Sequence, residues 1–157
     1  MLKSRRPAPE EKINSSDIIR LLVMYKPAVQ KIFHGQVLLS WDREKKEIEF
    51  QIPCTGNVYS KEALAHTNFH KLNLDELIPA VVLMKTVDEW MDLLTPQEAE
   101  ALFLRFVDVD HKGLHHGYKL MSYKEIGKKM GMDKKTVWEH VQRGIMKIQK
   151  LAFPHEI

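Results

Sequence analysis

The side chains with the clearest potential chemistry lie between residues 119 and 150. This range holds nine lysines and arginines against three carboxylates, and such a surplus of positive charge attracts phosphate groups. It also contains amide and carboxylate side chains of the kinds that hydrogen-bond base edges in duplex DNA. The candidate nucleic-acid contacts are Lys128, Lys129, Lys134, Lys135, Trp138, Glu139, Gln142 and Arg143.

Two helices joined by a tight turn are predicted to position these residues. Ser122 and Glu125 form a capping-box pattern, and Gly131 can end the first helix in the left-handed conformation. Asp133 can then cap the second helix. The apolar residues expected to share the buried side of this helix are Val137, Val141, Ile148 and Leu151. A short helix, a tight turn and a basic helix are typical of a DNA-binding helix-turn-helix.

The outer face of the second helix is the predicted reading face. At about 100° per residue, Trp138, Lys135 and Gln142 lie on the side away from the buried valines, and Glu139 lies beside them. Gln142 can pair with adenine, Lys135 can donate to guanine and Glu139 can accept from cytosine, while flanking cations meet phosphates. Trp138 has an alternative role, because its ring could pack against nearby tyrosines or the preceding helix.

A further helix start precedes this pair. Thr95-Pro96-Gln97-Glu98 combines a cap hydroxyl, a proline at the first helical position and a glutamate at the third. The segments that carry a family pattern are Leu94–Leu102, Ser122–Asp133, Thr136–Trp138 and Met146–Lys150. In this order, they resemble the carboxy-terminal promoter-recognition domain (region four) of bacterial sigma factors.

The resemblance implies promoter DNA binding through the helix that begins at Asp133, and contact with RNA polymerase, whose flap this family's domain usually grips. Two features depart from the family pattern. Glu139 follows Trp138 where basic or small residues are usual, and the loop over residues 107–121 is longer than is common. The first 93 residues do not resemble the sigma region that binds the polymerase clamp. We therefore expect a small sigma-like regulator of the phage or prophage type.

The expected fold class is mainly α, with a sigma region-four-like helix-turn-helix domain at the C-terminus and a small α+β N-terminal module. A first helix should end near Pro27, and a β-hairpin is predicted from Gln36–Trp41 and Lys46–Ile52. Pro79 should kink or restart the acidic helix. The expected parts are a flexible basic tail (1–12), the hairpin module (13–72, with a short helix over 60–72), an acidic connecting helix (73–93) and the helix-turn-helix domain (94–153).

Several function classes are excluded on composition. The longest apolar run, residues 77–84, is too short to span a bilayer, and the N-terminus lacks the apolar run of a secretory signal. A lone Cys54 is typical of a reducing compartment, so we expect a cytoplasmic protein. No catalytic motif is visible, and we expect neither an enzyme nor a cofactor. A zinc site is the weaker alternative for five histidines: His66, His70, His111, His115 and His116.

The sequence therefore predicts a sequence-specific, double-stranded DNA-binding transcription regulator. RNA polymerase is a second expected partner, no membrane is expected, and the protein should be a monomer or a homodimer. The alternative is a phage DNA-packaging protein of the small-terminase kind, which also joins a helix-turn-helix to an assembly module.

Overall fold

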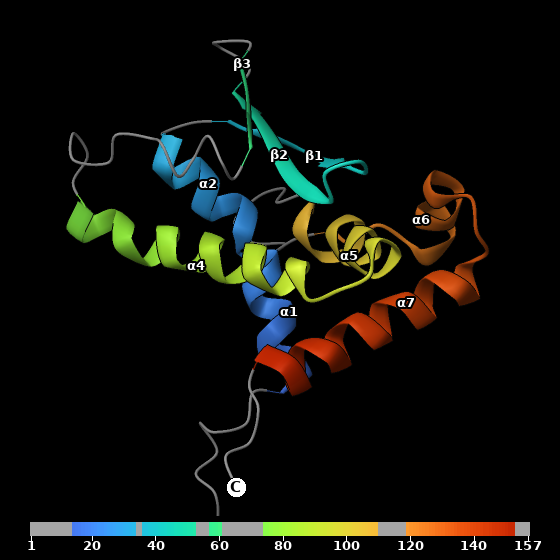
Figure 1. Cartoon of the computed structure of the whole chain (residues 1–157). Coiled ribbons are helices and arrows are strands. Elements are labelled where there is room, and N and C mark those ends of the chain that lie inside the picture. Colours follow the sequence, from blue (N-terminus) through green and yellow to red (C-terminus); the bar gives the residue numbers. More distant parts are fainter. Residues whose placement is uncertain (1–13, 34–35, 53–56, 61–73, 110–118, 153–157) are drawn as a thin grey trace, which may run out of the picture.

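The computed structural model describes residues 14–33, 36–52, 57–60, 74–109 and 119–152. A three-stranded sheet lies against a set of helices, and α7 runs along the side of the molecule remote from the sheet (Figure 1). Among the helices of the described ranges, none is long and apolar enough to cross a membrane. The expected basic tail, the helix predicted beyond Ser60 and the five candidate zinc ligands lie outside these ranges.

The N-terminal helices are α1 (Ser15–Val23) and α2 (Tyr25–Phe33). Asn14 caps α1, because its side-chain oxygen accepts a hydrogen bond from the Asp17 amide at 2.9 Å. The first helix ends at Val23, near Pro27 as expected, but Pro27 does not stop the helical segment, since it is the third residue of α2. Amides in the first turn of a helix have no intrahelical partner, so a proline there removes no hydrogen bond.

The sheet contains β1 (Leu38–Asp42), β2 (Glu47–Ile52) and β3 (Asn57–Ser60), which pair antiparallel in that order. The predicted hairpin is confirmed as β1 and β2, with Leu39 opposite Phe50. In β2, Ile48 and Phe50 are buried, and so is Glu47. The third strand was not predicted.

The turn between β1 and β2 forms without glycine. The Asp42 carboxylate accepts hydrogen bonds from the amides of Glu44 (3.0 Å) and Lys45 (3.1 Å). Lys46 takes a positive φ of 54°, a conformation that is uncommon outside glycine. The Asp42 carboxylate therefore stabilises the turn through its hydrogen bonds, and Lys46 adopts the conformation that a glycine would often take there.

The remaining helices follow the sheet. They are α4 (Leu74–Asp92), α5 (Pro96–Leu102) with a π-helical continuation η3 (Phe103–Val107), α6 (Tyr123–Met130), and α7 (Lys134–Lys147) with a π-helical continuation η4 (Ile148–Ala152). The helix α4 does not restart at Pro79, which lies inside it.

One expectation about the buried side of α7 is wrong. Val137, Val141 and Ile148 are buried as predicted, but Leu151 is 56% exposed. It lies in η4, where the wider π-helical turn advances each residue by a smaller angle than an α-helix does. Leu151 therefore falls off the buried face, and Ala152 packs against the core in its place.

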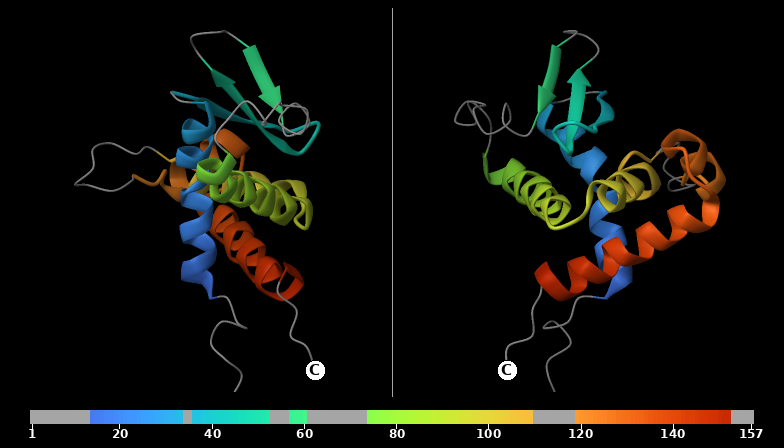
Figure 2. Two further views of the ribbon diagram at one scale, coloured as in Figure 1. Left: turned by 90° about the vertical axis from the view of Figure 1, so that its left-hand side faces the viewer. Right: turned by 45° about the vertical axis from the view of Figure 1, so that its right-hand side comes forward.

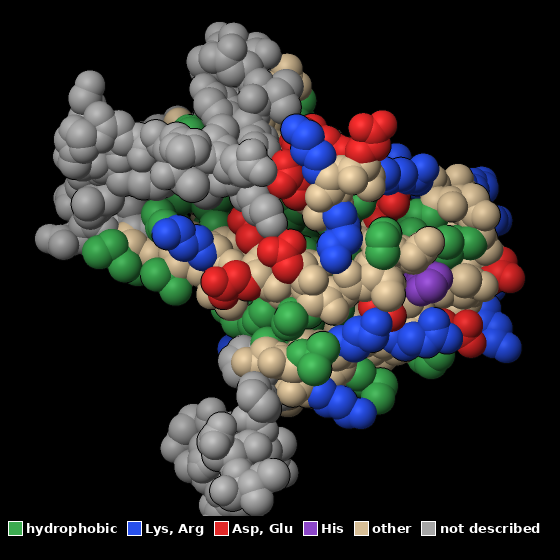
Figure 3. Space-filling model, in the orientation of Figure 1, with side chains coloured by type: hydrophobic (Ala, Val, Ile, Leu, Met, Phe, Trp, Pro, Cys, Tyr) green, Lys and Arg blue, Asp and Glu red, His purple; other side chains and the backbone are tan. Residues whose placement is uncertain are grey.

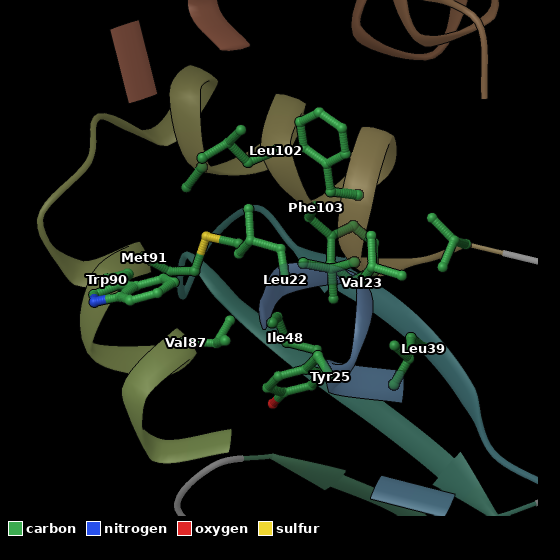
Figure 4. Close-up of a cluster of buried hydrophobic side chains, with 14 of the residues drawn as sticks. Leu22, Val23, Tyr25, Leu39, Ile48, Val87, Trp90, Met91, Leu102 and Phe103 are labelled. Atoms are coloured by element: carbon green, nitrogen blue, oxygen red, sulfur yellow. The ribbon is translucent and has the colours of Figure 1, made fainter. Parts of the chain in front are cut away.

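One hydrophobic core joins the helices with β1 and β2. It includes Ile18 from α1, Phe50 from β2, Met84 from α4 and Ile148 beyond α7 in a single cluster. Side chains from the N-terminal helices, β1, β2, α4 and α5 point toward one another (Figure 4). Views from two further directions show α1 lying against the helices that follow the sheet (Figure 2), and α1 contacts η3, α4 and α7. The C-terminal helices are thus supported by the N-terminal half of the chain.

Candidate nucleic-acid interface

The connection between α6 and α7 is the tight turn that the sequence predicts. Gly131 ends α6 with a left-handed φ of 71°. The Met132 amide donates to the Gly127 carbonyl at 2.9 Å. The Asp133 carboxylate caps α7 by accepting from the Thr136 amide at 2.7 Å. This hydrogen bond lowers the pKa of Asp133, so the cap stays ionised at neutral pH.

The capping box predicted at the start of α6 forms only in part. The Ser122 hydroxyl accepts a hydrogen bond from the Glu125 amide at 3.1 Å, which caps the helix. The Glu125 carboxylate accepts a hydrogen bond from the Ser122 hydroxyl at 3.2 Å. At the start of α5 the full box forms, with Thr95 and Glu98 bonding each other's amides.

An arginine holds the segment that enters α6. Arg105, in η3, donates from Nη1 to the Met121 carbonyl at 2.6 Å. Its guanidinium carbon lies 4.2 Å from the centre of the Tyr123 ring, within the range of cation–π attraction. The first turn of α6 is thereby fixed to η3.

Two contacts hold α7 on α5. Gly144 lies so close to α5 that an added Cβ would be 2.9 Å from a methyl carbon of Leu102. The Lys147 ammonium donates to the Glu98 carboxylate at 2.8 Å. Burial by itself would raise the pKa of Glu98, but the hydrogen bonds from Lys147 and the Thr95 amide outweigh it, and the pKa is lowered.

The predicted contact residues lie on the solvent side of this arrangement. Lysines and arginines gather over α6 and α7 in the space-filling view (Figure 3). Trp138 is 48% exposed, which favours a contact role over the alternative in which its ring is buried. Glu139 and Gln142 are partly exposed. The exposed members of the predicted set are Lys128, Lys129, Lys134, Lys135, Trp138 and Arg143.

A shallow hollow separates α6 from the first turn of α7. It has a volume of about 620 Å³, and its rim carries Lys124, Lys128 and Lys134 together with Asp133. Free amides at a helix start and nearby lysines suit a phosphate oxygen. Lys124 was not among the predicted contacts. Its spacing of four residues from Lys128, which places both on one face of α6, is the signal that could have identified it.

The C-terminal helices match a known family. The match covers residues 90–150. The matching family is sigma-70, region 4. The sigma region-four resemblance is thereby confirmed, and with it a mainly helical fold that carries a DNA-binding helix-turn-helix at its C-terminus. No curated protein matches the chain, and no solved structure matches it. Within the described ranges, no group of three or more His, Cys, Asp or Glu residues is placed to hold a metal ion.

Proposed function

We propose that this protein is a sequence-specific regulator of transcription that reads duplex DNA with the outer face of α7. The observation that carries the proposal is the exposed basic face of α6 and α7 within a sigma-70 region 4 domain. Lys135, Glu139 and Gln142 read base edges in the major groove, and Trp138 contacts the DNA beside them. Lys128, Lys129, Lys134 and Arg143 bind phosphates.

The proposal extends to partners and to the setting. Sigma region 4 domains generally interact with RNA polymerase, and we include that contact. The protein acts without catalysis and without a cofactor, as a monomer or homodimer in the cytoplasm, and it is of the phage or prophage type. Sizing chromatography tests the oligomeric state. A ring-shaped oligomer would instead support the DNA-packaging alternative.

The decisive experiment is affinity selection of sheared genomic duplex DNA at two salt concentrations, followed by sequencing. We expect enrichment of a few upstream regions with the unmodified protein and its loss with Lys135→Ala. Lys31→Ala is the matched control, since it removes an exposed lysine from α2, away from the reading face. Uniform recovery of all sequences by both proteins would contradict sequence-specific reading.

Binding constants separate the two kinds of contact. If the four cations 128, 129, 134 and 143 meet phosphates, log affinity falls with log salt with a slope of roughly −3 to −4. Gln142→Ala should cost on the order of 1–3 kcal/mol on the selected site and less on other sequences. A slope near zero would contradict phosphate binding. An equal loss on all sequences would show that Gln142 does not read bases.

Contact with RNA polymerase has its own test. Purified bacterial RNA polymerase is added to the complex of the protein with its selected DNA, and the mobility of the labelled DNA is measured. We expect a slower, ternary complex that does not form when the protein is omitted. Unchanged mobility would remove the polymerase from the proposal and leave the DNA-binding role in place.

A further inference from the structure

An arginine of the β-hairpin turn reaches two separate helices of the DNA-binding domain. The Arg43 guanidinium forms a fork with the Glu100 carboxylate of α5, in which Nε and Nη2 lie 2.9 Å from Oε1 and Oε2 respectively. The same Nη2 donates to the backbone carbonyl of Lys129 at 2.8 Å. Arg43 thus joins the hairpin, α5 and the end of α6 through one planar group.

The Lys129 carbonyl lies just before the turn that connects α6 to α7. It belongs to the last turn of α6, where carbonyl groups have no partner within the helix and carry partial negative charge. Gly131 and the turn into α7 follow directly. Because a guanidinium is rigid and planar, its simultaneous bonds to Glu100 and Lys129 fix the distance between α5 and the end of α6.

The β-hairpin has two further attachments to the same domain. The Lys46 ammonium donates to the Leu94 carbonyl at 2.5 Å, beside the start of α5. The Trp41 ring lies 5.6 Å, between centroids, from the Phe103 ring of η3. The Asp42 carboxylate organises the turn itself. The hairpin therefore supports the DNA-binding domain at three places, and Arg43 is the one that reaches the helix-turn-helix.

We propose that Arg43 is a positioning residue for DNA binding, which holds α6 and the turn into α7 at the orientation that α7 needs to enter the major groove. The inference rests on the proposed function and extends it to a residue of the N-terminal half. Arg43 touches no base or phosphate in this account. It acts on affinity by keeping most molecules in the binding-competent arrangement.

The test compares variants of the full-length chain in fluorescence titrations with labelled mixed-sequence duplex DNA. Arg43→Ala removes the fork, and we expect roughly tenfold weaker binding, in proportion to the lost competent fraction. Arg43→Lys keeps the charge but cannot make both contacts, so its affinity should lie between those of the unmodified protein and Arg43→Ala. Arg20→Ala is the control for the loss of one positive charge, because Arg20 is 75% exposed on α1 and lies 3.9 Å from its only ion-pair partner within the described ranges, Asp17.

The salt dependence distinguishes positioning from direct contact. A positioning residue adds no phosphate contact, so replacing Arg43 should change the slope of log affinity against log salt by much less than one. A slope smaller by about one would mean that Arg43 itself neutralises a phosphate, and would overturn the inference. Circular dichroism checks that each variant is folded, and Glu100→Gln should reproduce the affinity loss from the other side of the fork.

The titrations distinguish a failure of the proposed function from a failure of the positioning role of Arg43. If the unmodified protein binds no duplex DNA, the proposed function is wrong. If it binds, and Arg43→Ala and Arg43→Lys bind as tightly as it does, only the positioning role is overturned. Hydrogen exchange gives an independent readout, since loss of the fork should accelerate exchange of the Met132 amide, which closes the turn after α6.

Discussion

The turn of the helix-turn-helix depends on the absence of a side chain at Gly127. A Cβ at this position would lie 2.4 Å from the Met132 carbonyl oxygen. This distance is too short, so the backbone of the turn would have to move away from a side chain at this position. Gly131 has a different role, because it has open space around its Cβ position and is required for its positive φ. Two glycines four residues apart therefore serve two separate physical needs.

We predict that Gly127→Ala lowers the free energy of unfolding by about 1–3 kcal/mol, as overpacking does elsewhere, and weakens DNA binding because the turn moves. Urea denaturation and DNA titration measure both effects. Gly131→Asn is the matched control, since asparagine tolerates the left-handed conformation. Equal stability of Gly127→Ala and the unmodified protein would show that the turn adapts freely.

At the scale of elements, the pairing of α7 with α5 decides where the proposed reading face lies. Gly144 allows the close approach of the two helices, and the ion pair of Glu98 with Lys147 joins the start of α5 to the last turn of α7. Glu98 is almost fully buried, and its carboxylate also completes the capping box with Thr95. The Glu98 carboxylate thus stabilises both the start of α5 and the contact between α5 and α7.

This pairing predicts a pH-dependent stability. The pKa of Glu98 is lower in the folded protein than its usual value of 4.5, so its contribution is complete above that value and disappears as the pH falls through the lowered pKa. Glu98→Gln should therefore lower the free energy of unfolding by about 1–3 kcal/mol at neutral pH. The difference between the two proteins should shrink below pH 4.5. Urea denaturation at several pH values measures it, and a difference that grows on acidification would contradict the assignment.

The starts of α5, α6 and α7 could be predicted because their signals are local. Thr95, Ser122 and Asp133 each cap a helix by accepting a hydrogen bond from the amide three residues later. Gly131 indicates a left-handed conformation at its own position. Long-range features left no such signal. The fork between Arg43 and Glu100 joins residues 57 positions apart, and nothing in the local pattern of either residue indicates the other.

Two other features, β3 and the π-helical turn in η4, were also not predicted from the sequence. The strand β3 gains its regular structure from pairing with β2, so its own short sequence carried little of the information. The π-helical turn in η4 changes which residues face the core, and a fixed angle per residue cannot represent it. The exposed side of the first turns of α7 was predictable because these turns precede this change.

At the scale of the whole molecule, the DNA-binding domain and the N-terminal half share one core. Leu22 and Val23 of α1 lie in the same cluster as Leu102 and Phe103 of the domain (Figure 4). The hairpin adds polar contacts to the same domain through Arg43. The free energy of each half therefore depends on the presence of the other.

We predict a single cooperative unfolding transition. Tryptophan fluorescence reports mainly on the junction of the two halves, because Trp90 is buried in α4 and Trp41 packs on Phe103. Circular dichroism reports on all the helices. The two probes should give the same midpoint in urea. Two separated transitions would show that the halves unfold independently.

The shared core also means that the N-terminal half cannot complete its packing until the second half of the chain has been synthesised. Translation delivers α1 and the hairpin before α5, so Leu22 and Val23 leave the ribosome without the side chains that later cover them. Nascent chains that stop before α5 should be readily digested by protease, and chains released after η4 should resist. The speed of translation over the second half of the mRNA then determines how long these apolar side chains remain exposed and able to aggregate.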